Sequence, residues 1–107
     1  MTSWIILGLA GLLEVVFAVA LKQSRGLSHL PMALLAGVAM LCSLALLALA
    51  MRSIPVSAAY AIWTGIGAIG TVTAGILLFG EPASVLRVTS LTLILAGMVG
   101  LKIGADA

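Results

Sequence analysis

A single carboxylate interrupts the long apolar stretch between Trp4 and Leu21. The stretch reads WIILGLAGLLEVVFAVAL, and Glu14 lies near its middle. A charged side chain at the centre of a bilayer costs about 3 kcal/mol or more, and chains that keep one there generally use it. The alternative is a structural carboxyl group that only hydrogen-bonds to another helix. We interpret Glu14 as the functional group and ask which residues surround it.

Three polar or aromatic side chains recur at helical spacing further along the chain. Tyr60, Trp63 and Thr64 are three and four positions apart, so they share one face of a helix. Aromatic rings that carry a hydroxyl or an N–H suit the wall of a cation site, although an aromatic packing contact is the alternative. Ser43 is a hydroxyl within another apolar stretch. It can orient a carboxylate, or it can bond to its own helix backbone.

Glycines follow these aromatic residues in a pattern that resembles a nucleotide-binding motif. The run from Gly65 to Gly70 matches G-x-G-x-x-G, but that motif has meaning only between a strand and a helix of a βαβ unit. Here it lies within an apolar span, so we reject a nucleotide site. Clustered glycines permit a helix bend, and they also permit close helix packing. We expect a bend at Gly65 and Gly67, with close packing as the alternative.

The elements that hold these residues are membrane-spanning helices. Hydrophobic residues make up 64% of the 107 residues and charged residues only 7%, far below the roughly 25% of a soluble domain. About 20 apolar residues cross the hydrocarbon core as a helix. The sequence predicts an all-α integral membrane protein with one domain, residues 1–107, and four transmembrane helices. Their expected ranges are 2–21, 31–51, 56–79 and 84–102.

Composition also excludes several classes of function. The net charge of +2 comes with no run of basic residues, so we expect no nucleic-acid partner. His29 is the only histidine and Cys42 the only cysteine. The sequence therefore predicts no metal site and no cofactor. It also contains no nucleophile–base set, so we do not expect an enzyme.

The charges at the span ends set no clear orientation in the membrane. One side of a four-span chain would hold Arg52 and Lys102, and the other Lys22, Arg25 and Arg87. Orientation follows the Lys/Arg bias, and a difference of one is weak. Insertion of copies in both directions and a small bias that orients the chain are therefore equal alternatives. Two inverted copies can then enclose a polar path that four helices cannot shield from lipid.

The last span contains small residues rather than chemistry. Ser90 and Gly97 are seven positions apart on one helical face, a spacing that favours helix–helix contact. We expect these two residues in a homodimer interface.

Taken together, these residues resemble the small multidrug resistance family, and the resemblance covers essentially the whole chain. The Met40–Ser43 and Trp63–Ala68 segments look most like its guanidinium-exporter branch. The remaining anchors are Glu14-Val15-Val16, Leu21-Lys22-x-Ser24-x-Gly26, Pro55-Val56-x-x-Ala59-Tyr60-Ala61-Ile62-Trp63-Thr64-Gly65-Ile66-Gly67 and Gly100-Leu101-Lys102.

The resemblance implies an antiparallel, dual-topology homodimer in the bacterial inner membrane that exports guanidinium ion in exchange for protons. It implies that Glu14 binds both proton and substrate, and that Ser43, Tyr60 and Trp63 line the chamber. Phe17 departs from the tryptophan that is typical one turn after the glutamate. Since Phe lacks the indole N–H, a same-family exporter of quaternary ammonium or other drug cations is the alternative. A membrane subunit that transports nothing is a further one.

Overall fold

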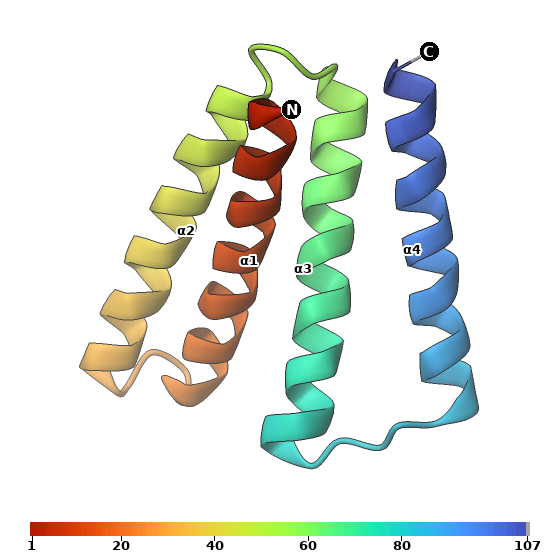
Figure 1. The fold of residues 1–107 in the computed structure, drawn as a ribbon. Coiled ribbons are helices and arrows are strands. Elements are labelled where there is room, and N and C mark those ends of the chain that lie inside the picture. Colours follow the sequence, from red (N-terminus) through yellow and green to blue (C-terminus); the bar gives the residue numbers. More distant parts are fainter. Residues whose placement is uncertain (107) are drawn as a thin grey trace.

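The computed structural model describes residues 1–106, and four long helices account for most of them. Each helix is long and apolar enough to cross a membrane. In Figure 1 they alternate in direction, with the two termini and the α2–α3 turn at one end and the other two turns at the opposite end. The helices are α1 (Thr2–Gln23), α2 (Leu30–Ala50), α3 (Val56–Phe79) and α4 (Val85–Asp106).

The turn between α1 and α2 is tight and depends on left-handed backbone. Arg25, Gly26 and Leu27 have φ values of 52°, 73° and 70°. The buried Ser24 hydroxyl donates to the carbonyl of Leu21 at 2.6 Å and accepts from the backbone N–H of Leu27 at 3.1 Å. These bonds hold in place a backbone conformation that residues other than glycine rarely adopt.

Proline and glycine mark the ends of α3. Pro55 precedes its first residue, and Gly80 ends it in the left-handed conformation at φ 66°. Glycine is favoured there because it has no Cβ to clash. The backbone N–H of Glu81 then donates to the carbonyl of Gly75 at 3.1 Å, which turns the chain towards α4.

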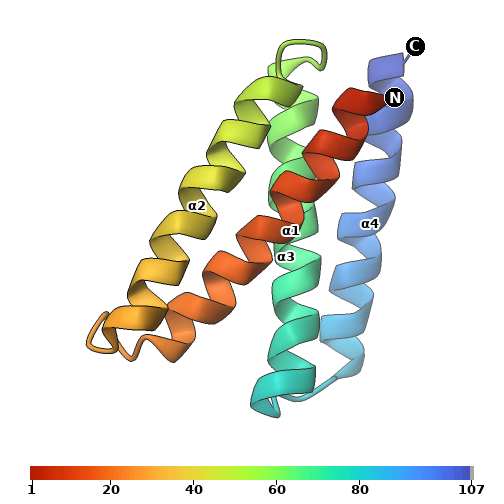
Figure 2. The same ribbon diagram turned by 60° about the vertical axis from the view of Figure 1, so that its left-hand side comes forward.

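Across the molecule the helices lie in the order α2, α1, α3, α4 (Figure 1). The α1 helix packs against both α2 and α3, and the backbone of α4 approaches α3 alone. Figure 2 shows α1 lying across α3, with α4 beyond. The core forms where the first three helices meet, around Leu7, Ala10, Leu47, Ile62 and Trp63.

The α4 helix adds almost nothing to this core. Between Val85 and Ala105 no residue is buried, although Met98 and Ala105 pack against the core from outside. Near the terminal end, the ammonium group of Lys102 lies 4.8 Å from the ring centroid of Trp4. Most of the surface of α4 is therefore left for lipid or for another chain.

Candidate functional site

The Glu14 carboxyl group lies between α1 and α3, directly against Gly67. Its Oε1 atom is buried, and it accepts no hydrogen bond from any of the residues that the structure describes. A Cβ atom at position 67 would overlap Oε1 and lie 2.5 Å from the carboxyl carbon. Gly67 therefore makes the space that this carboxyl group occupies.

Interlocking side chains hold the two helices close on either side of this contact. Ile66 of α3 fills the space above Gly11, and Val15 of α1 fills the space above Gly70. Close approach through small residues is how membrane helices gain contact without a hydrophobic driving force. The buried Oε1 side of the carboxyl group thus lies against the backbone of α3 between these aliphatic contacts, where an unpaired charge is unfavourable.

A buried hydrogen-bond chain links the first three helices beside Glu14. The indole N–H of Trp63 donates to the Ser43 hydroxyl at 2.9 Å, and that hydroxyl donates to the carbonyl of Ala10 at 2.6 Å. Ala10 lies one helical turn before Glu14. Ser43 therefore bonds neither to a carboxylate nor to its own helix backbone, the two partners expected from sequence. It ties α2 and α3 to the turn of α1 that carries Glu14.

We expect Ser43→Ala to lower stability, because it leaves the buried Trp63 N–H without its acceptor. Losing one partner of a buried hydrogen bond costs about 1–3 kcal/mol. Thermal unfolding of the purified protein in detergent measures the loss. Thr92→Val is the matched control, since the exposed Thr92 hydroxyl bonds only to the carbonyl of Val88 in its own helix. Equal melting temperatures for the two variants would contradict this prediction.

The aromatic face predicted on α3 divides between the inside and the outside of the chain. Trp63 is 7% exposed, whereas Tyr60 is 56% exposed and Thr64 is also exposed. The rings of Tyr60 and Trp63 still meet, with centroids 5.7 Å apart. Within the described residues no hydrogen bond joins either ring to Glu14. Phe17, one turn after Glu14, is half-buried. That these residues line a chamber stays a prediction.

The α3 helix runs without interruption through the glycines at which we expected a bend. Gly65 lies against Met98 of α4, just as Gly67 lies against Glu14. Close packing, the alternative interpretation, is what both glycines show in this structure. A bend at Gly65 and Gly67 stays a prediction for another conformation.

The two residues assigned to a dimer interface lie on the open surface of α4. The Ser90 hydroxyl bonds to the carbonyl of Leu86 in its own helix at 2.8 Å, and both Ser90 and Gly97 are exposed. A Cβ added at Gly97 would meet no atom within 4 Å. This face is free for a partner chain, and the dimer contact itself stays a prediction.

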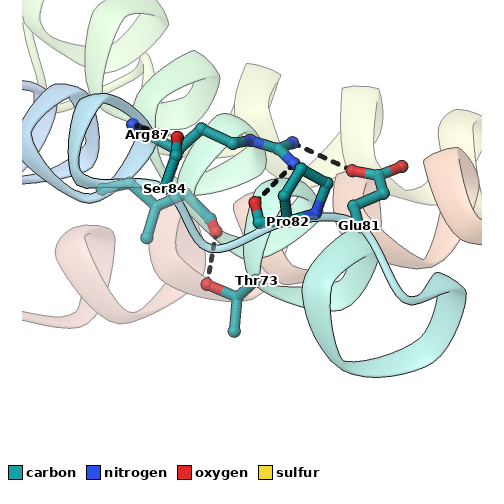
Figure 3. Close-up of polar contacts among 6 residues, drawn as sticks. Thr73, Glu81, Pro82, Ser84 and Arg87 are labelled. Atoms are coloured by element: carbon teal, nitrogen blue, oxygen red, sulfur yellow. Dashed lines mark hydrogen bonds and ion pairs between the residues drawn. The ribbon is translucent and has the colours of Figure 1, made fainter.

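Sequence reasoning did not single out a second carboxylate at the end of the same helices. Glu81 follows α3, and its carboxylate lies 2.9 Å from Nη2 of Arg87 (Figure 3). Gly75 makes room for this carboxyl group much as Gly67 does for Glu14. In the sequence, the eight-residue spacing of Gly67 and Gly75 on α3 was the feature that could have indicated this second carboxyl position.

Four membrane-length helices, with a carboxyl group midway along the first, define a small, multi-pass integral membrane protein. Residues 2–94 match the family described as Small Multidrug Resistance protein, and the chain belongs to that family.

Curated relatives in this family are similar over nearly their whole length, and each of the following is called a guanidinium exporter. The protein of Yersinia pestis is 55% identical over 103 residues, which cover 96% of this chain and 99% of the relative. That of Salmonella typhimurium is 57% identical, covering 96% and 98%. That of Escherichia coli K12 is 55% identical over 101 residues, covering 94% and 96%. These names describe transporters, in agreement with our expectation that the chain is not an enzyme.

Proposed function

We propose that this protein exports guanidinium ion across the bacterial inner membrane in exchange for protons. The observation that carries the proposal is the buried Oε1 of Glu14, which lies against Gly67 and accepts no hydrogen bond from the described residues. Such an oxygen suits a group that must alternately hold a proton and a cation. We take guanidinium as the cation because the similar proteins are called guanidinium exporters.

Proton and cation exclude one another at this carboxyl group. When Glu14 is protonated it is neutral and fits its apolar surroundings. When it is ionised it needs a positive partner, because an unpaired buried charge is costly. Guanidinium is planar and gives a carboxylate two parallel hydrogen bonds, as an arginine side chain does. Exchange of one for the other couples export to inward proton flow.

An antiparallel homodimer gives this exchange its enclosure. A polar path needs protein on all sides within a membrane, and four helices do not provide that. The almost equal division of basic residues between the two ends supports insertion of copies in both orientations. The unburied surface of α4, with Ser90 and Gly97, supports an interface there. In such a dimer two Glu14 side chains share one chamber.

Transport by purified protein in liposomes tests the proposal. An imposed proton gradient should drive guanidinium against its own concentration gradient, and adding guanidinium should move protons in the opposite direction. Liposomes without protein give the background. A purified protein that moves neither ion would refute the proposal and favour a membrane subunit that transports nothing.

The second candidate is export of quaternary ammonium or other drug cations by the same mechanism. Phe17 is the observation that favours it, because a phenyl ring offers no N–H donor one turn after Glu14. Guanidinium and a tetraalkylammonium ion compared in the same liposomes separate the two candidates.

We expect Phe17→Trp to sharpen the preference for guanidinium over tetraalkylammonium. The indole supplies an N–H that can orient the Glu14 carboxylate for a hydrogen-bonding cation, and its greater bulk disfavours large cations. One hydrogen bond to a charged group is worth about 1.5–3 kcal/mol, so the ratio of the two kcat/KM values should rise at least tenfold. Phe17→Leu, which adds no donor, is the control. An unchanged ratio would show that position 17 does not set selectivity.

A further inference from the structure

Beyond the contact of Glu14 with Gly67, residues of α1 and α3, with Glu81 and Arg87, line a cavity near the end of these helices. The cavity has a volume of about 250 Å³. Two of its lining residues lie one helical turn beyond the candidate site. Ala18 follows Glu14 by four positions, and Thr71 follows Gly67 by four positions. Lys22, Glu81 and Arg87 supply the charged groups that line it. The cavity therefore lies between the same two helices as Glu14, one turn further towards their ends.

The Glu81 carboxylate is held in a fixed place at this outer end. Its backbone N–H bonds to the carbonyl of Gly75, and a Cβ at position 75 would lie 2.8 Å from its carboxyl carbon. Arg87 approaches from the first turn of α4, donating through Nη2 to Glu81 at 2.9 Å and through Nη1 to the carbonyl of Pro82 at 3.0 Å (Figure 3). The acid is thus positioned by backbone, and the arginine lies across it.

The side chain that Glu81 binds is itself a guanidinium group. The side chains of Arg87 and Glu81 are 30% and 43% exposed. Ion pairs this exposed to solvent contribute little net stability, so a competing cation with the same donors can replace one partner at small cost. Free guanidinium has the planar, forked donor arrangement of the arginine head group. A tetraalkylammonium ion has no N–H and cannot reproduce those bonds.

We propose that Glu81 is a second, peripheral guanidinium site, at which the transported ion displaces Arg87 before or after it reaches Glu14. This inference rests on the proposed function, because it requires guanidinium as the transported cation. Arg87 then acts as a resident competitor that selects for cations able to make paired hydrogen bonds.

The third charged group in the cavity opposes cations in general. Lys22 lines the same space, and together the three charges give the cavity a net positive charge while Glu81 is paired. A cation therefore gains a favourable partner here only by replacing Arg87 on the carboxylate. The cation therefore binds because it replaces Arg87 on the Glu81 carboxylate, and the overall charge of the cavity does not attract it.

Two variants test the proposal through the sign of their effects on guanidinium transport. Arg87→Gln leaves the carboxylate free, and we expect KM to fall about fivefold with kcat unchanged, the upper range for one exposed ion pair. Adding Glu81→Gln to Arg87→Gln removes the carboxylate as well, and KM should return to or exceed that of the unaltered protein. If the pair only fixes the loop, both variants disturb that loop and their KM values shift in the same direction.

Arg52→Gln is the matched control, since it removes one positive charge at the opposite end of the helices and should leave KM within about twofold. Melting temperature and elution volume show that each variant is folded. Shifts of the same sign in the two test variants, or a rise in KM for Arg87→Gln, would overturn the peripheral site alone. Absence of guanidinium transport by the unaltered protein would overturn the proposed function and this inference with it.

Discussion

Glu14→Gln should reduce proton-driven guanidinium transport to the level of liposomes without protein. Gln is nearly the same size and fits the space against Gly67, so the helices should still pack. It carries no ionisable proton and no negative charge, so it can neither release a proton nor bind the cation by paired charge-assisted hydrogen bonds. The expected loss is therefore complete, unlike the partial effects of the other substitutions.

Glu14→Asp is the control for this variant. It keeps the carboxyl group and withdraws it by one methylene, so we expect slower but still proton-coupled transport. Elution volume and melting temperature should match those of the unaltered protein for both variants. Coupled guanidinium uptake by Glu14→Gln at a normal rate would disprove the assignment of this residue.

The second large effect is expected from adding a single methyl group to α3. In Gly67→Ala the new Cβ overlaps the Glu14 carboxyl group, so either that group leaves its place or the two helices separate. Displacing a reacting group by about 1 Å can lower an enzymatic rate about a hundredfold, and we expect a loss of guanidinium transport between tenfold and that limit. Initial rates at saturating guanidinium measure it.

Gly37→Ala on α2 is a matched control, because a Cβ there meets no atom within 4 Å. Alanine is also the better helix former, so this variant should be at least as stable as the unaltered protein. Transport by Gly67→Ala at the rate of Gly37→Ala would show that the contact with Glu14 is not needed for function.

The sequence predicted the four helices well because apolar length alone decides them. Their ends were less certain, since polar residues there can continue a helix. Lys22 and Gln23 extend α1 up to Ser24, whose hydroxyl caps its last turn. At the start of α4, the Ser84 hydroxyl accepts from the backbone N–H of Arg87 at 3.2 Å, so the helix begins one residue later than expected.

Partners within the site were harder to predict, because they depend on contacts between distant parts of the chain. Helical spacing placed Tyr60, Trp63 and Thr64 on one face, but it did not show that only Trp63 points into the core. The bond from Ser43 to Ala10 joins residues 33 positions apart. Hydropathy carries no information about such a contact, nor about which glycine lies against Glu14.

The exposed face of α4 has a consequence, under the proposed dimer, for how such proteins diversify. The backbone of α4 does not approach α1, so in the proposed dimer substitutions on the exposed face with Ser90 and Gly97 leave the contacts of Glu14 unchanged. In the proposed dimer, substitutions on this face alone can therefore change which copies associate. Under these proposals, partner choice falls to the exposed face of α4 with Ser90 and Gly97, whereas Arg87 of the same helix takes part in cation binding.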